Sequence, residues 1–299
     1  MASARFEGSG AALVTPFDEK GVNERVLREL VRFHHQNGTD ALIVCGSTGE
    51  AATMSAGEQR HAIEVVVDEN GGRLPVIAGC GGSDTAAVAR LAAQARDAGA
   101  DAVLVSAPPY NKPTQRGLLA HYRAVLAEAD LPLIVYNVPG RTAVNIAPAT
   151  IAELATDDRV IGVKEACGDI SQVAELARLV GDRLAIWSGN DDQVVPILAL
   201  GGVGVISVLA NIAPADVSTM VRRFRDGDVA GARALQLRYL PLIRALFAEP
   251  NPIPVKTAVA WLGFEVGPLR LPLTPLEGEA LERLIAALKE AGLQPLARV

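Results

Sequence analysis

The sequence predicts a (β/α)8 barrel, the TIM-barrel fold, followed by a C-terminal helical extension. Short runs rich in β-branched residues alternate with amphipathic stretches of helical period, and eight such runs occur before residue 210. An open doubly wound sheet is the alternative, but no Gly-x-Gly-x-x-Gly follows the first run. We therefore assign residues 1–225 to the catalytic barrel and residues 226–299 to a helical extension packed on it.

The predicted strands are apolar runs that begin every 20 to 34 residues along the chain. This interval suits one strand, one helix and their loops. In order they are Ala11–Val14, Ala41–Cys45, Pro75–Gly79, Ala102–Ser106, Leu131–Tyr136, Val160–Lys164, Leu184–Ser188 and Gly204–Val208.

Helices are expected between these strands and again after the eighth strand. Two helix starts have capping-box sequences, Ser55 with Glu58 and Thr274 with Glu277. About 90 residues follow the last strand, more than one closing helix requires. The clearest helical patterns are Glu24–Gln36, Ala56–Asp68, Thr85–Ala98, Gln115–Ala129, Ala230–Phe247, Val255–Leu262 and Leu276–Ala291.

Composition excludes several classes of function. The net charge of −6 and the pI near 5.4 argue against nucleic acid as a main partner. The segment Met1–Gly8 lacks the apolar core of a secretion signal, and no apolar stretch reaches the roughly 18 residues of a membrane helix. The three cysteines, Cys45, Cys80 and Cys167, lie in or beside apolar segments, as reduced core residues do. We expect a cytoplasmic protein that binds neither membrane nor nucleic acid.

Lys164 ends a β-branched run that is typical of a strand buried on both faces. Burial disfavours the ammonium form, so the pKa of this side chain should fall toward neutrality. A neutral amine is a nucleophile for carbonyl carbons, and an arginine cannot replace it because guanidinium stays protonated. The chain has only five lysines beside twenty-three arginines. The strand alone leaves two interpretations open: imine catalysis, or a buried ion pair with Glu165 or another carboxylate.

Polar side chains also stand at the ends of other predicted strands. Ser47 and Thr48 follow the second strand, Tyr110 follows the fourth, and Tyr136 ends the fifth, with Arg141 shortly after it. The carboxyl ends of barrel strands form one surface, so these groups should meet Lys164 there. Hydroxyls relay the protons that imine formation requires, and arginine binds carboxylates. Each of these groups also has a purely structural explanation. Tyr110 and Tyr136 could serve packing, Ser47 and Thr48 could cap the next helix, and Arg141 could form a surface ion pair.

Metal or cofactor chemistry has no support in the sequence. The four histidines, His34, His35, His61 and His121, lack the spacings of zinc sites. Neither a phosphate-binding loop nor a Gly-x-Ser-x-Gly nucleophile elbow occurs. We expect an enzyme without metal or organic cofactor.

Several motifs resemble those of one known family. From about Gly8 to Leu293 the chain resembles the pyruvate-dependent class I aldolases and lyases, the N-acetylneuraminate lyase family. Within it the chain is most similar to the branch that condenses pyruvate with L-aspartate 4-semialdehyde. The motifs are Gly46-Ser-Thr-Gly-Glu50, Tyr110-Asn-Lys-Pro113, Tyr136-Asn-Val-Pro-Gly-Arg-Thr142, Gly162-Val-Lys-Glu165 and Glu249-Pro-Asn-Pro-Ile-Pro-Val-Lys256.

The resemblance implies a catalytic role for four of these residues. Lys164 would form the imine with pyruvate. Tyr136, Ser47 and Tyr110 would relay protons, with Tyr110 reaching in from a neighbouring subunit of a homotetramer built from two tight dimers. The product would be 4-hydroxy-tetrahydrodipicolinate, in lysine and diaminopimelate synthesis.

The resemblance also implies how the substrates are bound. Thr48 would hold the pyruvate carboxylate and Arg141 the carboxylate of L-aspartate 4-semialdehyde. Backbone groups near Gly189 and Ile206 would line the pocket.

Three departures from the family pattern matter. Ser47-Thr48 stands where this branch usually has Thr-Thr, and related sugar-acid lyases also have Ser-Thr. Pro109 replaces a tyrosine that often precedes the relay tyrosine. We predict weak or absent inhibition by lysine; strong inhibition at sub-millimolar lysine would contradict this. The positions aligned with the lysine feedback site lack binding groups for a diamino acid: Ala56, Gln59, Ser83, Ala87 and Pro109.

Two alternatives remain at this stage. The first is a pyruvate-dependent lyase of the same family acting on N-acetylneuraminate or a 2-keto-3-deoxy acid. Arg141 disfavours it, because sugar-acid lyases generally lack an arginine there and carry polyol-binding groups instead. The second is a barrel that only binds or regulates, which the retained Lys164, Tyr136 and Tyr110 disfavour.

Overall fold

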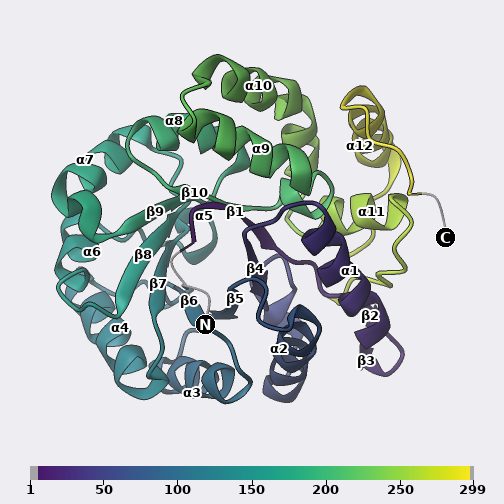
Figure 1. Ribbon diagram of the computed structural model, residues 1–299. Coiled ribbons are helices and arrows are strands. Elements are labelled where there is room, and N and C mark those ends of the chain that lie inside the picture. Colours follow the sequence, from purple (N-terminus) through teal and green to yellow (C-terminus); the bar gives the residue numbers. More distant parts are fainter. Residues whose placement is uncertain (1–5, 297–299) are drawn as a thin grey trace.

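Eight parallel strands close into a barrel surrounded by helices, as predicted (Figure 1). The computed structural model describes residues 6–296, so the first five residues of the N-terminal segment considered above lie outside it. Around the barrel the strand order is β1-β10-β9-β8-β7-β6-β5-β4, and β4 pairs with β1 to complete the closure. The (β/α)8 fold class is therefore confirmed.

The observed strands match the eight predicted ones to within a few residues. A short hairpin of β2 and β3, which the sequence did not predict, lies between the first two barrel strands. The strands are β1 (Gly8–Ala12), β2 (Phe17–Asp18), β3 (Gly21–Val22), β4 (Ala41–Val44), β5 (Val76–Cys80), β6 (Ala102–Ser106), β7 (Leu133–Asn137), β8 (Val160–Glu165), β9 (Ala185–Ser188) and β10 (Gly204–Ser207).

The first strand begins at Gly8, three residues before the predicted start at Ala11. Its glycines carry no apolar signal, yet the packing requires them. A Cβ on Gly10 would lie 2.7 Å from the side chains of both Ile43 and Phe6. The hydrophobic pattern therefore missed the part of the strand where the neighbouring side chains approach most closely.

Helices ring the barrel, and α10, α11 and α12 extend beyond that ring on one side (Figure 1). Most predicted helices are confirmed, with ends shifted by at most two residues. The α-helices are α1 (Glu24–Gln36), α2 (Ala56–Asn70), α3 (Thr85–Asp97), α4 (Gln115–Ala129), α5 (Pro139–Thr142), α6 (Pro148–Leu154), α7 (Ile170–Val180), α8 (Val194–Ala199), α9 (Pro214–Arg225), α10 (Val229–Leu246), α11 (Ile253–Trp261) and α12 (Gly278–Glu290). Short 3-10 turns are η1 (Ala51–Thr53), η2 (Gly181–Arg183), η3 (Asp191–Gln193) and η4 (Leu209–Asn211).

One capping prediction is confirmed and the other is wrong. At the start of α2, Ser55 and Glu58 form the reciprocal capping box. At the start of α12, Glu277 is itself the N-cap and makes no side-chain capping bond. Gly278, the first residue of α12, has a left-handed φ of 57°, and the helix begins there rather than at the position that Thr274 would cap.

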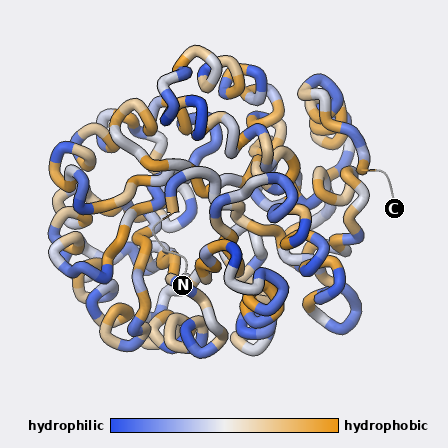
Figure 2. The backbone as a smooth tube through the Cα atoms, viewed as in Figure 1, coloured by the Kyte–Doolittle hydropathy of each residue, from blue (hydrophilic) through white to orange (hydrophobic). Residues whose placement is uncertain are grey.

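Two hydrophobic cores hold the barrel together. Inside it, Ile43, Ile77 and Ile206 pack with Trp187. The Trp187 indole fits because Gly162 leaves room: a Cβ there would lie 2.2 Å from the ring. A larger core lies between the strands and the surrounding helices, and Figure 2 shows the orange strands enclosed by helices with blue outer faces.

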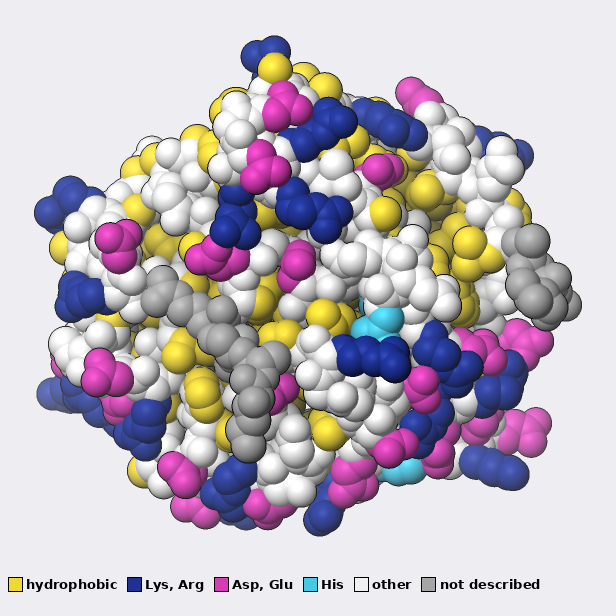
Figure 3. Space-filling model, viewed as in Figure 1, with side chains coloured by type: hydrophobic (Ala, Val, Ile, Leu, Met, Phe, Trp, Pro, Cys, Tyr) yellow, Lys and Arg dark blue, Asp and Glu magenta, His cyan; other side chains and the backbone are white. Residues whose placement is uncertain are grey.

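The surface carries charges of both signs. On the face seen in Figure 3, Lys and Arg side chains alternate with Asp and Glu side chains around the rim. None of the helices within residues 6–296 is long and apolar enough to cross a membrane. The same residues contain no group of three or more His, Cys, Asp or Glu side chains placed to share a metal ion.

The helices after α9 are part of the same packed structure. α10 packs against α9, and α12 packs against α10 and α11. The division at residues 225 and 226 stays a prediction.

Candidate active site

A cavity of about 710 Å³ opens at the carboxyl ends of the barrel strands. Its lining includes residues from the turns after β4, β7 and β9, from β8 itself, and from the segment between α10 and α11. Of the predicted site residues, the cavity brings together Lys164, Tyr136, Ser47, Thr48, Arg141 and Gly189.

Lys164 is buried at the end of β8, with 5% of its surface exposed. The register of the sheet places it between Tyr136 on β7 and Trp187 on β9. Its Nζ lies 4.5 Å from the centre of the Tyr136 ring. Burial lowers the pKa of Lys164 to about 8; the Asp191 carboxylate opposes this shift, and the Arg141 guanidinium adds to it. The amine is therefore partly neutral near neutral pH.

The alternative of an ion pair between Lys164 and Glu165 is not observed. Glu165 accepts hydrogen bonds from the Asn137 side chain at 3.0 and 3.2 Å and from the Cys167 backbone N–H at 2.9 Å. Successive side chains of a strand point to opposite faces, so Glu165 faces the helices while Lys164 faces the cavity. Within residues 6–296, Lys256 is the lysine that forms an ion pair.

The Lys164 side chain has room because residue 189 is a glycine and has no side chain. A Cβ on Gly189 would lie 2.7 Å from the Ala166 Cβ and 3.2 Å from the Lys164 Cε. The Gly189 N–H donates to the Glu165 carbonyl at 2.7 Å, which fixes the end of β9 against β8. Any larger residue at position 189 would press on the amine.

Asp191 supplies a fixed carboxylate behind the cavity wall. It accepts hydrogen bonds from the Ser207 hydroxyl and from the backbone N–H groups of Val208 and Leu209, at 2.5, 3.0 and 2.9 Å. Burial raises its pKa, whereas these three hydrogen bonds and the charge of Lys164 favour the ionised form. Its negative charge favours a cation at Lys164.

Ser47 and Thr48 lie on a tight turn after β4. The Gly49 N–H donates to the Gly46 carbonyl at 3.0 Å, and Glu50 takes a left-handed φ of 57°. A Cβ on Gly49 would lie 3.2 Å from the Leu13 carbonyl oxygen. The turn therefore holds the Ser47 and Thr48 hydroxyls at the cavity wall.

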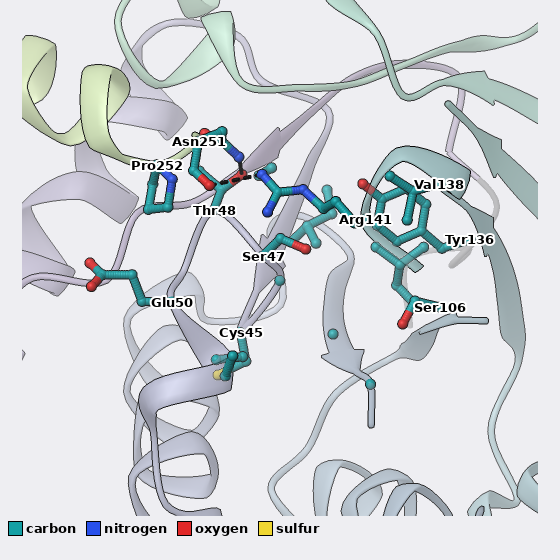
Figure 4. A pocket seen from close by; sticks show the side chains of 18 of the residues that line it. Cys45, Ser47, Thr48, Glu50, Ser106, Tyr136, Val138, Arg141, Asn251 and Pro252 are labelled. Carbon is teal, nitrogen blue, oxygen red and sulfur yellow. Dashed lines mark hydrogen bonds between the residues drawn. The ribbon is translucent and has the colours of Figure 1, made fainter. Parts of the chain in front are cut away.

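Tyr136 and Arg141 come from neighbouring parts of the chain, at the end of β7 and in α5. Burial raises the pKa of Tyr136 to about 12, although the charge of Arg141 lowers it somewhat. The phenol therefore keeps its proton at neutral pH. In Figure 4 the Arg141 side chain lies between Tyr136 and Asn251.

Arg141 meets a residue of the C-terminal region. Its Nη2 donates to the Asn251 carbonyl at 2.8 Å, and the Asn251 side-chain Nδ2 donates to the Thr48 Oγ1 at 3.0 Å (Figure 4). Within residues 6–296 the Asn251 carbonyl is the hydrogen-bond partner of this guanidinium, and no carboxylate pairs with it. A cation at a cavity without an internal counter-ion suits an anionic ligand.

A buried ion pair ties the C-terminal region to the same turn. The Lys256 Nζ on α11 donates to the Glu50 Oε1 at 2.7 Å and to the Pro268 carbonyl at 2.8 Å. The other Glu50 oxygen accepts from the Arg270 N–H at 2.9 Å. The residues after the barrel therefore complete the site.

Tyr110 and Ile206 are the predicted site residues that do not line the cavity of this chain. Tyr110 is 88% exposed and has a left-handed φ of 70°. Ile206 is fully buried in the barrel interior, two residues before Val208, which does line the cavity. The roles given to both remain predictions.

Three residues with contacts at this site received no role from the sequence: Glu50, Asn251 and Lys256. They lie within two of the family-like motifs, Gly46–Glu50 and Glu249–Lys256. A polar residue between two prolines, as at Asn251, was the one local indication. Apart from the Pro268 carbonyl, which Lys256 contacts, their partners are 110 to 220 residues away, and periodicity carries no information about such contacts.

Comparison with known proteins shows one family over nearly the whole chain. Residues 5–291 match the model of the dihydrodipicolinate synthetase family. A relative from Thermoanaerobacter sp. (strain X514), named 4-hydroxy-tetrahydrodipicolinate synthase, is 53% identical over 96% of this chain and 97% of its own.

Solved structures agree with the sequence relatives. Dihydrodipicolinate synthase from Aquifex aeolicus is 42% identical, with a TM-score of 0.95 over 98% of this chain and 100% of its own. The chloride-inhibited dihydrodipicolinate synthase from Acinetobacter baumannii, solved in complex with pyruvate, is 40% identical, with a TM-score of 0.93 over 96% of this chain and 99% of its own. This chain belongs to the dihydrodipicolinate synthetase family.

Proposed function

We propose that this enzyme condenses pyruvate with L-aspartate 4-semialdehyde to give 4-hydroxy-tetrahydrodipicolinate, for lysine and diaminopimelate synthesis. The observation that carries the proposal is the buried amine of Lys164, whose pKa of about 8 leaves it partly neutral. The same cavity presents Arg141, which within residues 6–296 has a backbone carbonyl and no carboxylate as its partner. The family is of the class I aldolase type, and the same chemistry runs here at Lys164 without metal or organic cofactor.

The first steps form the nucleophile. The neutral Lys164 amine adds to carbon 2 of pyruvate, and the resulting carbinolamine loses water to form an iminium. Loss of a proton from carbon 3 gives an enamine, which attacks the aldehyde carbon of the second substrate and leaves a hydroxyl there. The amino group of that substrate then displaces Lys164 from carbon 2, closing the ring. The overall change is the union of both substrates with loss of one water.

Proton transfers are assigned to Tyr136, Ser47 and Tyr110. Tyr136 suits this role because it keeps its proton and lies directly beside Lys164. Ser47 lines the same cavity. Tyr110 belongs to a neighbouring subunit in this proposal: it projects away from its own chain and carries the strain of a left-handed φ.

Each substrate carboxylate has its own binding group. Thr48 holds that of pyruvate beside Lys164, with the backbone near Gly189 and Ile206 completing the pocket. Arg141 binds the carboxylate of L-aspartate 4-semialdehyde through a paired hydrogen bond. The barrels assemble as a homotetramer made of two tight dimers, which supplies Tyr110.

A coupled assay tests the proposal and its rival together. Pyruvate with L-aspartate 4-semialdehyde is compared with N-acetylneuraminate and 2-keto-3-deoxy sugar acids in the cleavage direction. The proposal requires the semialdehyde reaction to have a kcat/KM at least about a hundredfold above that of any sugar acid, the order of discrimination that one charged hydrogen bond supplies. A higher value for a sugar acid would assign the rival activity.

A further inference from the structure

Asn251 contacts two polar residues that line the cavity, Thr48 and Arg141. Its side-chain Nδ2 donates to the Thr48 Oγ1 at 3.0 Å, and its backbone carbonyl accepts from the Arg141 Nη2 at 2.8 Å. Figure 4 shows both bonds meeting at this residue. The two partners precede it in sequence by 203 and 110 residues, so the contacts are set by the fold.

Asn251 is held rigidly. It is 6% exposed and stands between Pro250 and Pro252, whose rings restrict the backbone on both sides. Five residues later, Lys256 forms its buried ion pair with Glu50. This segment is therefore tied at two points to the turn that carries Thr48.

The direction of these hydrogen bonds has a chemical consequence. Because the Thr48 oxygen accepts from Asn251, its own O–H remains free to donate to a substrate anion. Because the Asn251 carbonyl takes one donor of Arg141, the guanidinium is oriented while its other N–H groups stay available for a carboxylate. Asn251 thus orients two groups, Thr48 and Arg141, that can bind anions.

We propose that Asn251 is a positioning residue that fixes the separation and orientation of Thr48 and Arg141, and so selects substrate pairs in which one carboxylate reaches each of these two groups. The inference rests on the proposed function, in which those two residues hold the two substrate carboxylates. It predicts that a change at one side chain weakens the binding of both substrates.

The main test is Asn251→Asp, which keeps the size of the side chain. The Nδ2 donor is lost, the Thr48 hydroxyl turns to the new carboxylate, and Arg141 gains an internal anion. We expect KM for pyruvate and KM for the semialdehyde each to rise about tenfold or more, the effect of one charge-assisted hydrogen bond. Asn251→Ala removes the donor to Thr48 but keeps the backbone carbonyl that Arg141 contacts, so it should raise KM for pyruvate by about 3- to 10-fold and change KM for the semialdehyde less. Asn37→Asp, at the end of α1, is the matched control.

Arg141→Ala distinguishes positioning from general damage. In the wild type this substitution should raise KM for the semialdehyde alone. In the Asn251→Asp background it should raise that KM by a much smaller factor. Borohydride trapping of saturating pyruvate on each variant shows that the site is folded. An unchanged KM for pyruvate in both Asn251 variants, or a rise for one substrate only in Asn251→Asp, would overturn the inference.

Failure of the proposed function is a separate outcome. It appears in the wild-type enzyme, as absence of the pyruvate adduct or of semialdehyde turnover. If the wild type is active and the Asn251 variants have the same KM values as the wild type, only the positioning role is contradicted.

Discussion

Tyr136 and Lys164 lie side by side at the ends of β7 and β8, with the Lys164 Nζ 4.5 Å from the centre of the Tyr136 ring. The ring face favours the ammonium, whereas burial favours the neutral amine. Burial prevails, because the pKa of Lys164 falls to about 8 from its ordinary value of 10.5. About a tenth of the amine is then neutral at pH 7. The nucleophilic amine therefore lies against the ring of a tyrosine that keeps its phenol proton.

The pKa of Lys164 predicts the pH dependence of adduct formation. Below about pH 8 the amine is mostly protonated, so the rate of imine formation should rise close to tenfold per pH unit and level off above that value. Single-turnover adduct formation with pyruvate, followed between pH 6 and pH 10, measures the midpoint. A midpoint near that of an exposed lysine would contradict the role of burial.

Arg141→Ala should weaken the second substrate specifically. The lost charged hydrogen bond costs about 1.5–3 kcal/mol, which raises KM for L-aspartate 4-semialdehyde by roughly 10- to 150-fold. Steady-state kinetics with both substrates varied give the two constants. Adduct formation with pyruvate alone is the control and should change little. Semialdehyde kinetics equal to those of the wild type would show that another group binds that carboxylate.

Removing one partner of the ion pair between Glu50 and Lys256 should destabilise the protein more than removing both partners together. Glu50→Gln or Lys256→Met leaves one buried charge without its partner, at a cost of about 3–5 kcal/mol. The double variant should recover much of this loss, because no unpaired charge remains. Urea unfolding of the four proteins measures the coupling. Additive effects of the two substitutions would argue against the pair.

The proposed origin of Tyr110 in a neighbouring subunit predicts complementation. Tyr110→Phe and Lys164→Ala chains should each be nearly inactive. Mixed oligomers, formed by joint refolding, contain sites with an intact Lys164 and an intact Tyr110 from different chains, so part of the activity should return. Mixtures no more active than their components would place the relay within one chain or remove Tyr110 from it.

Patterns of hydrophobicity predicted the barrel because each buried strand is a continuous apolar run. All eight barrel strands were found, and Lys164 at the end of β8 stood out as a charge in apolar surroundings. The predicted ends of elements were less accurate where close packing or backbone conformation, and not hydrophobicity, determines the residue. The glycines at the start of β1 and the left-handed Gly278 at the start of α12 reflect close packing and backbone conformation.

The candidate site was predictable where its residues follow strands. Tyr136, Ser47 and Arg141 lie at the cavity as the alternation of strands and helices required. Asn251 was not predictable in this way, because its partners Thr48 and Arg141 are far away in sequence. Its place depends on how the C-terminal helices return to the mouth of the barrel.

Reductive trapping tests the central claim most directly. The enzyme is incubated with pyruvate and borohydride, digested, and mapped by mass spectrometry. We expect one stable adduct, on Lys164, that is absent from Lys164→Ala. The peptide containing Lys256, a buried lysine paired with Glu50, is an internal control and should stay unmodified. An unmodified Lys164, or an adduct that persists in Lys164→Ala, would contradict imine catalysis at this residue.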